Sequence, residues 1–319
     1  MKLLFAGLIV AVSLSTCAQT NPQPVSPEWT YELGSAGIPQ ADMTVKVGDG
    51  PEQTGKYVAI YHRTTDGTSW PAVMSVYSSG YMRLTPAYAK PVPFGTSIVL
   101  GPSYRSGGQY YHNLQVKSVT VEGNMASDDR LTMVVVGTVG ALDVSSTIVV
   151  ERPTTAGIRC LVSSRAKWRE DTAIDQVALA KHEGFKVMQF SSMYNDGNYH
   201  DADFVHYQGQ TGYVKSQLLN SDGFILHDQL PLQEPWLELG HSDAEGWQGA
   251  TPTLRITMTD PATASAFTPC GWVTASTDEN NDNVGLWLHW DEVASGYHFG
   301  DELAFDYVIE AVEQPRDPK

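Results

Sequence analysis

The feature that most constrains the fold is an alternation of apolar and polar residues in two segments near the C-terminus. In Thr253–Met258 an apolar residue occupies every second position, and Thr or Arg fills the positions between. Leu303–Glu310 again places its large apolar residues at every second position. Successive side chains of a strand point to opposite faces, so a period of two predicts strands with one buried and one solvated face. Antiparallel sheets are typically built from such strands.

Short strand signals also recur through the rest of the chain. They are rich in β-branched and aromatic residues, and turn formers such as Thr65-Asp66-Gly67 and Ser78-Ser79-Gly80 separate them. Further strands are predicted at Tyr57–Tyr61, Val73–Tyr77, Tyr81–Leu84, Ser97–Leu100, Leu114–Val121, Leu131–Val136, Ser145–Val150, Ile158–Ser163, Phe185–Phe190 and Trp236–Leu239.

This pattern predicts an all-β protein, specifically a large antiparallel β-sandwich of the extended or super-sandwich kind. One segment, Asp171–Gly184, carries apolar residues at helical spacing, and Asp171 or Thr172 could cap its start, so we expect one short covering helix there. The chain has no convincing internal repeat, which argues against a propeller or a solenoid. A division into two sandwiches near Trp168–Gly184 is the alternative.

The first residues have the pattern of an export signal. Residues 1–18 combine a positive start, the apolar run Leu3–Val12 and a polar end, and the apolar run is too short to span a bilayer. We therefore expect an exported protein that is extracellular, periplasmic or an outer-membrane lipoprotein. Residues 19–30 read as a proline-rich tether and residues 31–319 as a single sandwich domain.

Two processing routes fit this signal. Leu14–Cys17 is similar to a bacterial lipoprotein box, which would make Cys17 a lipid anchor, although the Thr before the cysteine departs from the usual small residue. Ordinary cleavage after Ala18 would instead remove Cys17. Cys160 and Cys270 then remain, either as a disulfide or as two separately buried thiols.

Charge narrows the choice of partner. The 20 Lys and Arg against 36 Asp and Glu give a formal net charge of −16, and such a field repels polyanions. Nucleic acid is therefore a poor partner, and a strongly anionic polysaccharide would need a local cluster of cations.

The first polar cluster follows the strand predicted at Phe185–Phe190. Asp196 and Asn198, together with Asp201 or Asp203, could supply the oxygen ligands that Ca²⁺ needs. Alternatively, His200 and His206 with one carboxylate could bind Zn²⁺. The other interpretation is a solvated polar loop whose Asn and Asp side chains stabilise their own turn.

A second cluster occupies Tyr104–Asn113, around a pair of glycines. Arg105 or Asn113 could neutralise the carboxylate of a uronic acid, and Tyr111 or His112 could transfer protons in a β-elimination. A lyase of this kind would have the cluster face His200 and Tyr207 across one groove. The alternative is a set of aromatic residues that caps the end of a sheet.

Two further groups carry aromatic residues that suit the apolar face of a sugar ring. Trp287 and His289 share one face of their predicted strand, and His241 precedes Trp247 by six positions. Four carboxylates are candidates for a glycosidase pair, namely Asp201, Asp203, Asp243 and Glu245.

The sequence lacks the motifs of serine hydrolases, zincins, kinases and dinucleotide-binding enzymes. We therefore expect a carbohydrate-active protein with a polysaccharide or oligosaccharide partner, most readily one that cleaves it as a lyase or glycoside hydrolase. The alternative is a glycan-binding or envelope surface protein without catalysis. Geometry separates the two, because a shared active site requires the first and second clusters to lie together.

Overall fold

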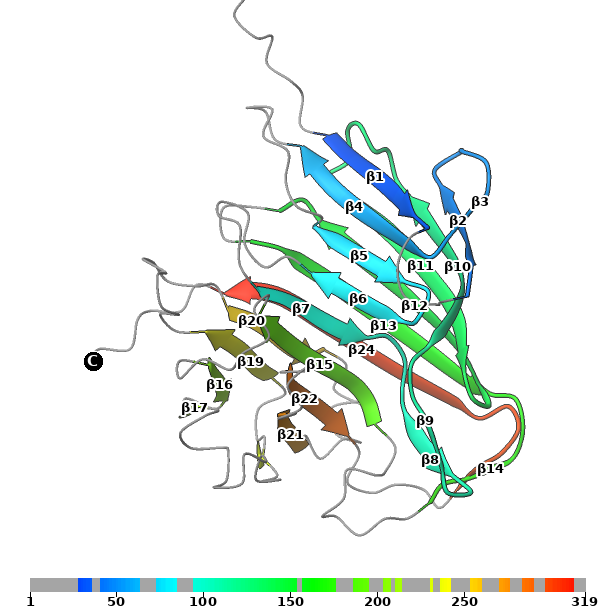
Figure 1. Cartoon of the computed structure of the whole chain (residues 1–319), viewed down its shortest axis with the longest axis vertical. Coiled ribbons are helices and arrows are strands. Elements are labelled where there is room, and N and C mark those ends of the chain that lie inside the picture. The colour runs from blue at the N-terminus through cyan, green and yellow to red at the C-terminus, as the bar shows by residue number, and fades with distance from the viewer. Residues whose placement is uncertain are drawn as a thin grey trace, which may run out of the picture.

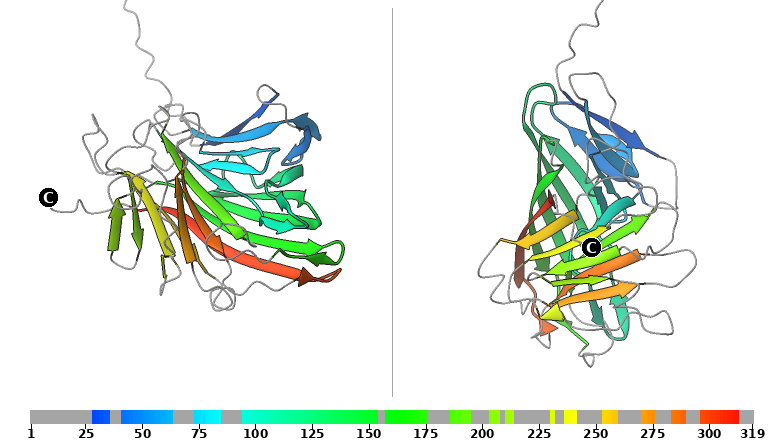
Figure 2. Two further views of the ribbon diagram at one scale, coloured as in Figure 1. Left: turned by 60° about the horizontal axis from the view of Figure 1, so that its bottom comes forward. Right: turned by 90° about the vertical axis from the view of Figure 1, so that its left-hand side faces the viewer.

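A computed structural model describes residues 28–35, 41–63, 73–84, 94–153, 157–175, 186–194, 203–207, 210–213, 230–231, 236–241, 253–259, 270–275, 283–289 and 296–312. Within these ranges the chain forms 24 strands and no helix. The strands build two large sheets that face each other (Figures 1 and 2). The predicted all-β sandwich is confirmed.

The two large sheets differ in size. The nine-stranded sheet runs in the order β1 (Glu28–Gly34), β4 (Tyr57–Arg63), β5 (Met74–Tyr77), β6 (Tyr81–Leu84), β7 (Phe94–Val99), β15 (Lys186–Tyr194), β22 (Asn283–His289), β21 (Cys270–Ala275) and β18 (Leu230–Pro231). The eleven-stranded sheet runs β17 (Gln210–Tyr213), β16 (Asp203–Tyr207), β19 (Trp236–His241), β20 (Thr253–Met258), β24 (Glu302–Val312), β13 (Arg159–Trp168), β12 (Leu142–Glu151), β11 (Arg130–Val139), β10 (Gln115–Glu122), β2 (Met43–Val47) and β3 (Gln53–Gly55).

Two small two-stranded sheets lie at one end of the sandwich (Figure 1). One pairs β8 (Tyr104–Ser106) with β9 (Gln109–Tyr111), and the other pairs β14 (Thr172–Ala173) with β23 (Gly296–Tyr297). In the large sheets the pairs are antiparallel except for β10 and β2, which run parallel. Strands from before and after residues 168–184 pair with each other in both sheets, since β7 pairs with β15 and β13 pairs with β24.

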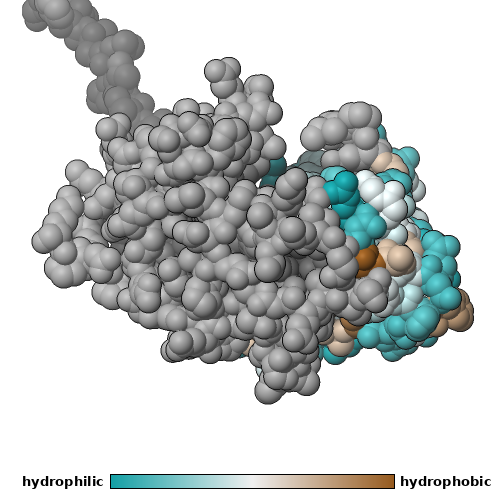
Figure 3. Space-filling view, turned by 90° about the horizontal axis from the view of Figure 1, so that it is seen from below, coloured by the Kyte–Doolittle hydropathy of each residue, from teal (hydrophilic) through white to brown (hydrophobic). Residues whose placement is uncertain are grey.

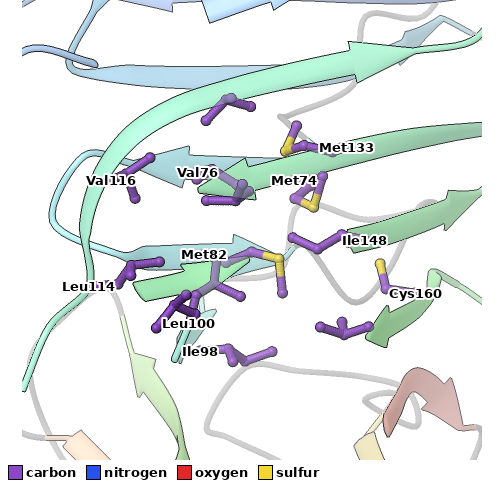
Figure 4. Packing of buried hydrophobic residues seen from close by; sticks show 14 of the residues in the cluster. Met74, Val76, Met82, Ile98, Leu100, Leu114, Val116, Met133, Ile148 and Cys160 are labelled. Carbon is purple, nitrogen blue, oxygen red and sulfur yellow. The ribbon is translucent and has the colours of Figure 1, made fainter. Parts of the chain in front are cut away.

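The core lies between the inner faces of the large sheets. Val58, Met82 and Ile98 of the nine-stranded sheet are fully buried, as are Ile148 and Cys160 of the eleven-stranded sheet. Figure 4 shows these layers meeting, with methionine side chains filling space between branched ones. Burial of each large side chain contributes about 1.5–3 kcal/mol, so the alternating strands are held by this contact.

The predicted strands are confirmed, with β6 and β20 matching their predicted bounds and the others differing at one or both ends by a few residues. The turn between β5 and β6 shows why its sequence was a reliable signal. Gly80 has a φ of 81°, and a β-carbon there would lie 2.6 Å from Leu114, so only glycine fits.

Three predictions differ from the structure. The segment expected to begin a helix at Asp171 or Thr172 begins with a strand, because Thr172 pairs with Tyr297, while residues 176–185 lie outside the described ranges. The part of the first cluster from Asp203 to Tyr207 is not a loop but strand β16, paired on both sides. Residues 28–30, assigned to the tether, belong to β1, which pairs with β4.

Cys160 is a buried free thiol, so it does not form a disulfide with Cys270. Register gives the physical reason. Cys160 faces the core from the eleven-stranded sheet, whereas position 270 is in line with His289 on the outer face of the other sheet. In the described parts of the chain, no helix is long and apolar enough to cross a membrane.

Candidate functional site

The outer face of the nine-stranded sheet carries a row of residues with a charged group at each end, across β1, β4, β5 and β6. The register aligns Glu32 with Ala59, Ala59 with Ser75, and Ser75 with Arg83. Glu32 and Arg83 at the ends are exposed, while the intervening Ala59 and Ser75 are small and buried. The alternate residues of these strands fill the core, so this row lies on the side away from it.

Two tyrosines stand beside this row. Tyr57 is paired directly with Tyr77, and their ring centroids lie 5.5 Å apart at an interplanar angle of 33°. Tyr57 is also paired with Gly34, and a β-carbon at Gly34 would lie 1.6 Å from the Tyr57 ring. The ring therefore lies over the glycine, and both tyrosines remain half-exposed.

Glu32 accepts hydrogen bonds from two phenols. The Tyr57 hydroxyl lies 3.3 Å from Glu32 Oε1, and the Tyr61 hydroxyl lies 3.0 Å from Oε2. Burial, followed by the hydrogen bond to Glu32, raises the pKa of Tyr61 to about 12. Burial, followed by the charge of Glu32 and the hydrogen bond to it, raises the pKa of Tyr57. Both phenols therefore stay protonated near neutral pH and donate to the carboxylate.

Arg83 completes the arrangement at the other end. Its guanidinium carbon lies 5.4 Å from the centroid of the Tyr77 ring, in a cation–π contact. We call Glu32, Tyr57, Tyr61, Tyr77 and Arg83 the tyrosine platform. It runs from a carboxylate through two rings to a guanidinium, over a span of about 14 Å for three inter-strand spacings.

The register continues this face onto later strands. Tyr81 is in line with Val99 of β7, Gln189 of β15, Trp287 of β22 and Trp272 of β21. Trp287, predicted to bind substrate, therefore occupies an outer-face position in a row neighbouring the platform. Leu286 is in line with the buried Ile98, which confirms that positions 286 and 287 lie on opposite faces.

The platform can bind but offers little for proton transfer. Half-exposed rings can stack on an apolar ligand face, a carboxylate can accept from hydroxyls, and a guanidinium can donate. Glu32 already accepts hydrogen bonds from two phenols, and the pKa values of both phenols are raised.

Sequence reasoning placed Tyr57, Tyr61 and Tyr77 in strands without assigning them to a site. The even spacing of Tyr57 and Tyr61, opposite the apolar Val58 and Ile60, was the available signal.

The second predicted cluster forms the hairpin of β8 and β9, and its arginine, Arg105, already has a carboxylate partner. The carboxylate of Asp175 accepts the backbone N–H groups of Gly107 at 3.0 Å and Gly108 at 2.7 Å. Arg105 Nε lies 3.7 Å from the same carboxylate, and the Asp175 N–H donates to the Arg105 carbonyl. Arg105 thus helps fasten the hairpin.

Aromatic residues of this hairpin pack as a column over the end of the sandwich. Tyr111 stacks on Tyr104 at 4.9 Å, Tyr104 meets Trp168 edge-on at 4.9 Å, and Trp168 stacks on Tyr297 at 4.8 Å. The Tyr104 hydroxyl accepts the N–H of Ala141 at 2.7 Å. This column anchors the hairpin to the turn between β11 and β12.

The remaining members of the cluster lie at its edge. His112 is exposed and stacks on Tyr110 at 4.9 Å, while the Tyr110 hydroxyl donates to Ser103. Asn113 has a φ of 65° and turns the chain into β10. Seen from below, the coloured surface at this end is mainly hydrophilic with scattered apolar residues (Figure 3).

The structure does not bring Tyr207 to this hairpin. Tyr104 of the hairpin contacts Trp168, whose backbone N–H donates to the carbonyl of Asp301 next to the start of β24. By contrast, β16 joins the sheet through β19 and β20 in line with Glu310. From Asp301 to Glu310 the chain runs about 30 Å at the usual rise per residue. Figure 1 shows β8 and β9 at one end and β16 at the other.

Around β16, Asp203 is paired directly with His241 of β19. His200, Trp247, Asp196, Asp201, Asp243 and Glu245 lie outside the described residues. Among the residues that are described, no three His, Cys, Asp or Glu side chains gather as a metal site. The metal and glycosidase assignments stay predictions.

Sequence reasoning also missed a buried carboxylate on β19. Glu238 is fully buried and accepts a hydrogen bond from Arg255 Nε at 2.6 Å, while the Arg255 guanidinium lies 4.9 Å from the Trp236 ring. His206 is its cross-strand neighbour on β16. The alternation of Trp236–His241 places Glu238 on the outer face, where a solvated carboxylate is expected.

No protein-family model matches the chain, and no curated protein matches its sequence. Several solved structures resemble it loosely. A galactose mutarotase related enzyme from Lactobacillus acidophilus is 9% identical with a TM-score of 0.33, covering 88% of this chain and 100% of that one. A GH36 alpha-galactosidase from Geobacillus stearothermophilus is 10% identical with a TM-score of 0.42, covering 86% of this chain and 41% of that one.

A GalM/aldose epimerase homologue from C. elegans is 10% identical with a TM-score of 0.34, covering 86% of this chain and 99% of that one.

Proposed function

We propose that this protein binds carbohydrate through the tyrosine platform and does not cleave it. The observation that carries the proposal is the contact of Tyr57 with Tyr77 and of Tyr77 with Arg83, on an outward sheet face that ends at Glu32. Flat amphipathic rings offer their faces to the C–H side of a sugar, and the charged ends supply acceptors and donors for hydroxyl groups. A rigid sheet holds these groups in place before the ligand arrives.

Two observations favour binding over cleavage. Arg105, which would neutralise a uronate in a lyase, is held by Asp175, and Tyr111 packs in the aromatic column. Tyr207 lies far along the sandwich from them. The groups proposed for β-elimination therefore have no common position at which a substrate could meet all of them.

The proposal also includes the cellular location of the protein. We infer export from residues 1–18, with Cys17 either lipidated or removed. Mass spectrometry of the mature N-terminus separates the two routes, since a diacylglyceryl cysteine and a start beyond Ala18 differ in mass. An N-terminus that begins at Met1 would contradict export.

The binding test uses a panel of neutral and acidic polysaccharides in affinity electrophoresis. We expect retardation by at least one glycan. Binding should be about tenfold or more weaker in the double variant Tyr57→Ala with Tyr77→Ala, since each substitution removes a ring face that the bound sugar would cover. Tyr31→Ala is the matched control, because Tyr31 is exposed and lies on the opposite face of the same strand.

The same incubations report on cleavage. Reducing ends and the ultraviolet absorbance of unsaturated sugars should stay at the level of a protein-free blank. Product release from any glycan would overturn the non-catalytic assignment. Failure of every glycan to bind would overturn the proposed function itself.

A further inference from the structure

The two ends of the tyrosine platform offer opposite hydrogen-bonding groups. At one end Glu32 offers only oxygen lone pairs, because the carboxylate is an acceptor and both phenols direct their protons onto it. At the other end Arg83 offers only N–H donors. A ligand that spans the platform must therefore present donors at the Glu32 end and acceptors at the Arg83 end.

Arg83 differs from most arginines of the described chain. Arg159, Arg165 and Arg255 each lie within ion-pair distance of a carboxylate. Within the described ranges no carboxylate lies within ion-pair distance of Arg83, whose contact is the Tyr77 ring, and its side chain is exposed. Stacking on a ring covers the face of a guanidinium and leaves the N–H donors at its edge free. These donors form a planar fork that matches the two oxygens of a carboxylate.

We propose that Arg83 binds the carboxylate of a sugar acid. The ligand is then a glycan whose backbone is neutral and which carries isolated uronic acid units. This rests on the proposed carbohydrate-binding function of the platform. The rings of Tyr57 and Tyr77 take the neutral backbone, and the uronate lies on Arg83. The net charge of −16 supports isolated units over a polyuronate, because a single local cation faces a repulsive overall field.

The test compares matched oligosaccharide pairs by calorimetry at low salt. Xylotetraose, mannotetraose and galactotetraose are each used plain, with one glucuronic acid unit, and with that unit as its methyl ester. For at least one backbone we expect the glucuronate form to bind about tenfold more tightly than both other forms, as one charge-assisted hydrogen-bonded pair provides.

Variants of Arg83 test whether this residue causes the tighter binding of the glucuronate form. Arg83→Gln should remove the tenfold difference between the glucuronate and plain forms, with a smaller loss in binding of the plain oligosaccharide, and Arg83→Lys should retain only part of that difference. Arg130→Gln is the matched control, since Arg130 is exposed on the other large sheet. Thermal unfolding of each variant checks that the fold is intact.

The outcomes separate the two proposals. Plain oligosaccharides that bind as tightly as their glucuronate forms would overturn the assignment of Arg83 and leave the proposed function standing. A glucuronate gain that survives Arg83→Gln would also overturn it. If no member of any set binds, both proposals fail together.

Discussion

The ring of Tyr57 lies over Gly34, where a β-carbon would stand 1.6 Å from the ring atom Cε1. Because Gly34 and Tyr57 are direct partners on β1 and β4, the edge strand leaves room for the ring to lie down beside Glu32. The orientation of the Tyr57 ring thus depends on the absence of a side chain at position 34.

Replacing Gly34 with Ala should therefore displace the Tyr57 ring. We expect a loss of about 1–3 kcal/mol in the free energy of unfolding, as for other overpacked sites, together with weaker glycan binding. Chemical denaturation and affinity electrophoresis measure the two effects. The control is the same change in a Tyr57→Ala background, where no ring remains to be displaced, and an equal cost there would contradict this explanation.

Glu32→Gln should lower the pKa of Tyr61 from about 12 toward its ordinary value. The fall will be partial, because burial is the larger cause and the hydrogen bond to Glu32 the second. NMR titration of tyrosine ring carbons, assigned with Tyr61→Phe, follows the change. An unchanged pKa would show that the carboxylate does not hold this phenol.

The same pKa predicts how stability depends on alkaline pH. A phenol whose folded pKa is raised stabilises the fold fully below its unfolded pKa, near 10, and this contribution is lost as pH rises toward about 12. The native protein should therefore lose stability more steeply than Glu32→Gln between these values. Denaturation curves at stepped pH provide the measurement, and parallel curves would contradict the prediction.

Asp175→Ala should loosen the β8–β9 hairpin without affecting glycan binding. The N–H groups of Gly107 and Gly108 lose their acceptor, at a cost of about 1–2 kcal/mol, and Arg105 loses its partner. Faster amide exchange in Gly107 and Gly108 reports the loosening. A large loss of glycan binding would instead place the ligand at this hairpin and favour the site that sequence reasoning chose.

Strands were predictable where the information is local. The alternation in Thr253–Met258 and Leu303–Glu310 reflects one buried face, and the structure confirms both as β20 and β24. The polar residues of Asp203–Tyr207 obscure the period of two and favour a loop, yet pairing on both sides makes this segment a strand. Thr172 likewise enters a strand because of Tyr297, which is distant in sequence.

The site was harder to predict because it depends on register. Tyr57 and Tyr77 become neighbours only when β4 pairs with β5 in one alignment, and a slip of one residue would turn one of them into the core. Aromatic residues such as Trp287 predicted a sugar-binding surface, and the register puts Trp287 at an outer-face position of the same sheet. The cluster at Arg105 and His112 attracted attention by its composition, whereas its contacts serve the hairpin.

Cys160 provides a test of the core that is independent of the site. Its burial raises the pKa of the thiol, and it lies on the inner face of β13 between its partners Val150 and Ile309. A thiol-specific reagent should therefore leave Cys160 unmodified in the native protein and modify it after unfolding, because the thiolate is the reactive form.

Reductant should not change the melting temperature, since Cys160 is in no disulfide. Cys160→Ser should cost about 1–3 kcal/mol more than Cys160→Ala if its hydroxyl finds no partner in the apolar layer, and a fall in melting temperature on reduction would contradict the free thiol.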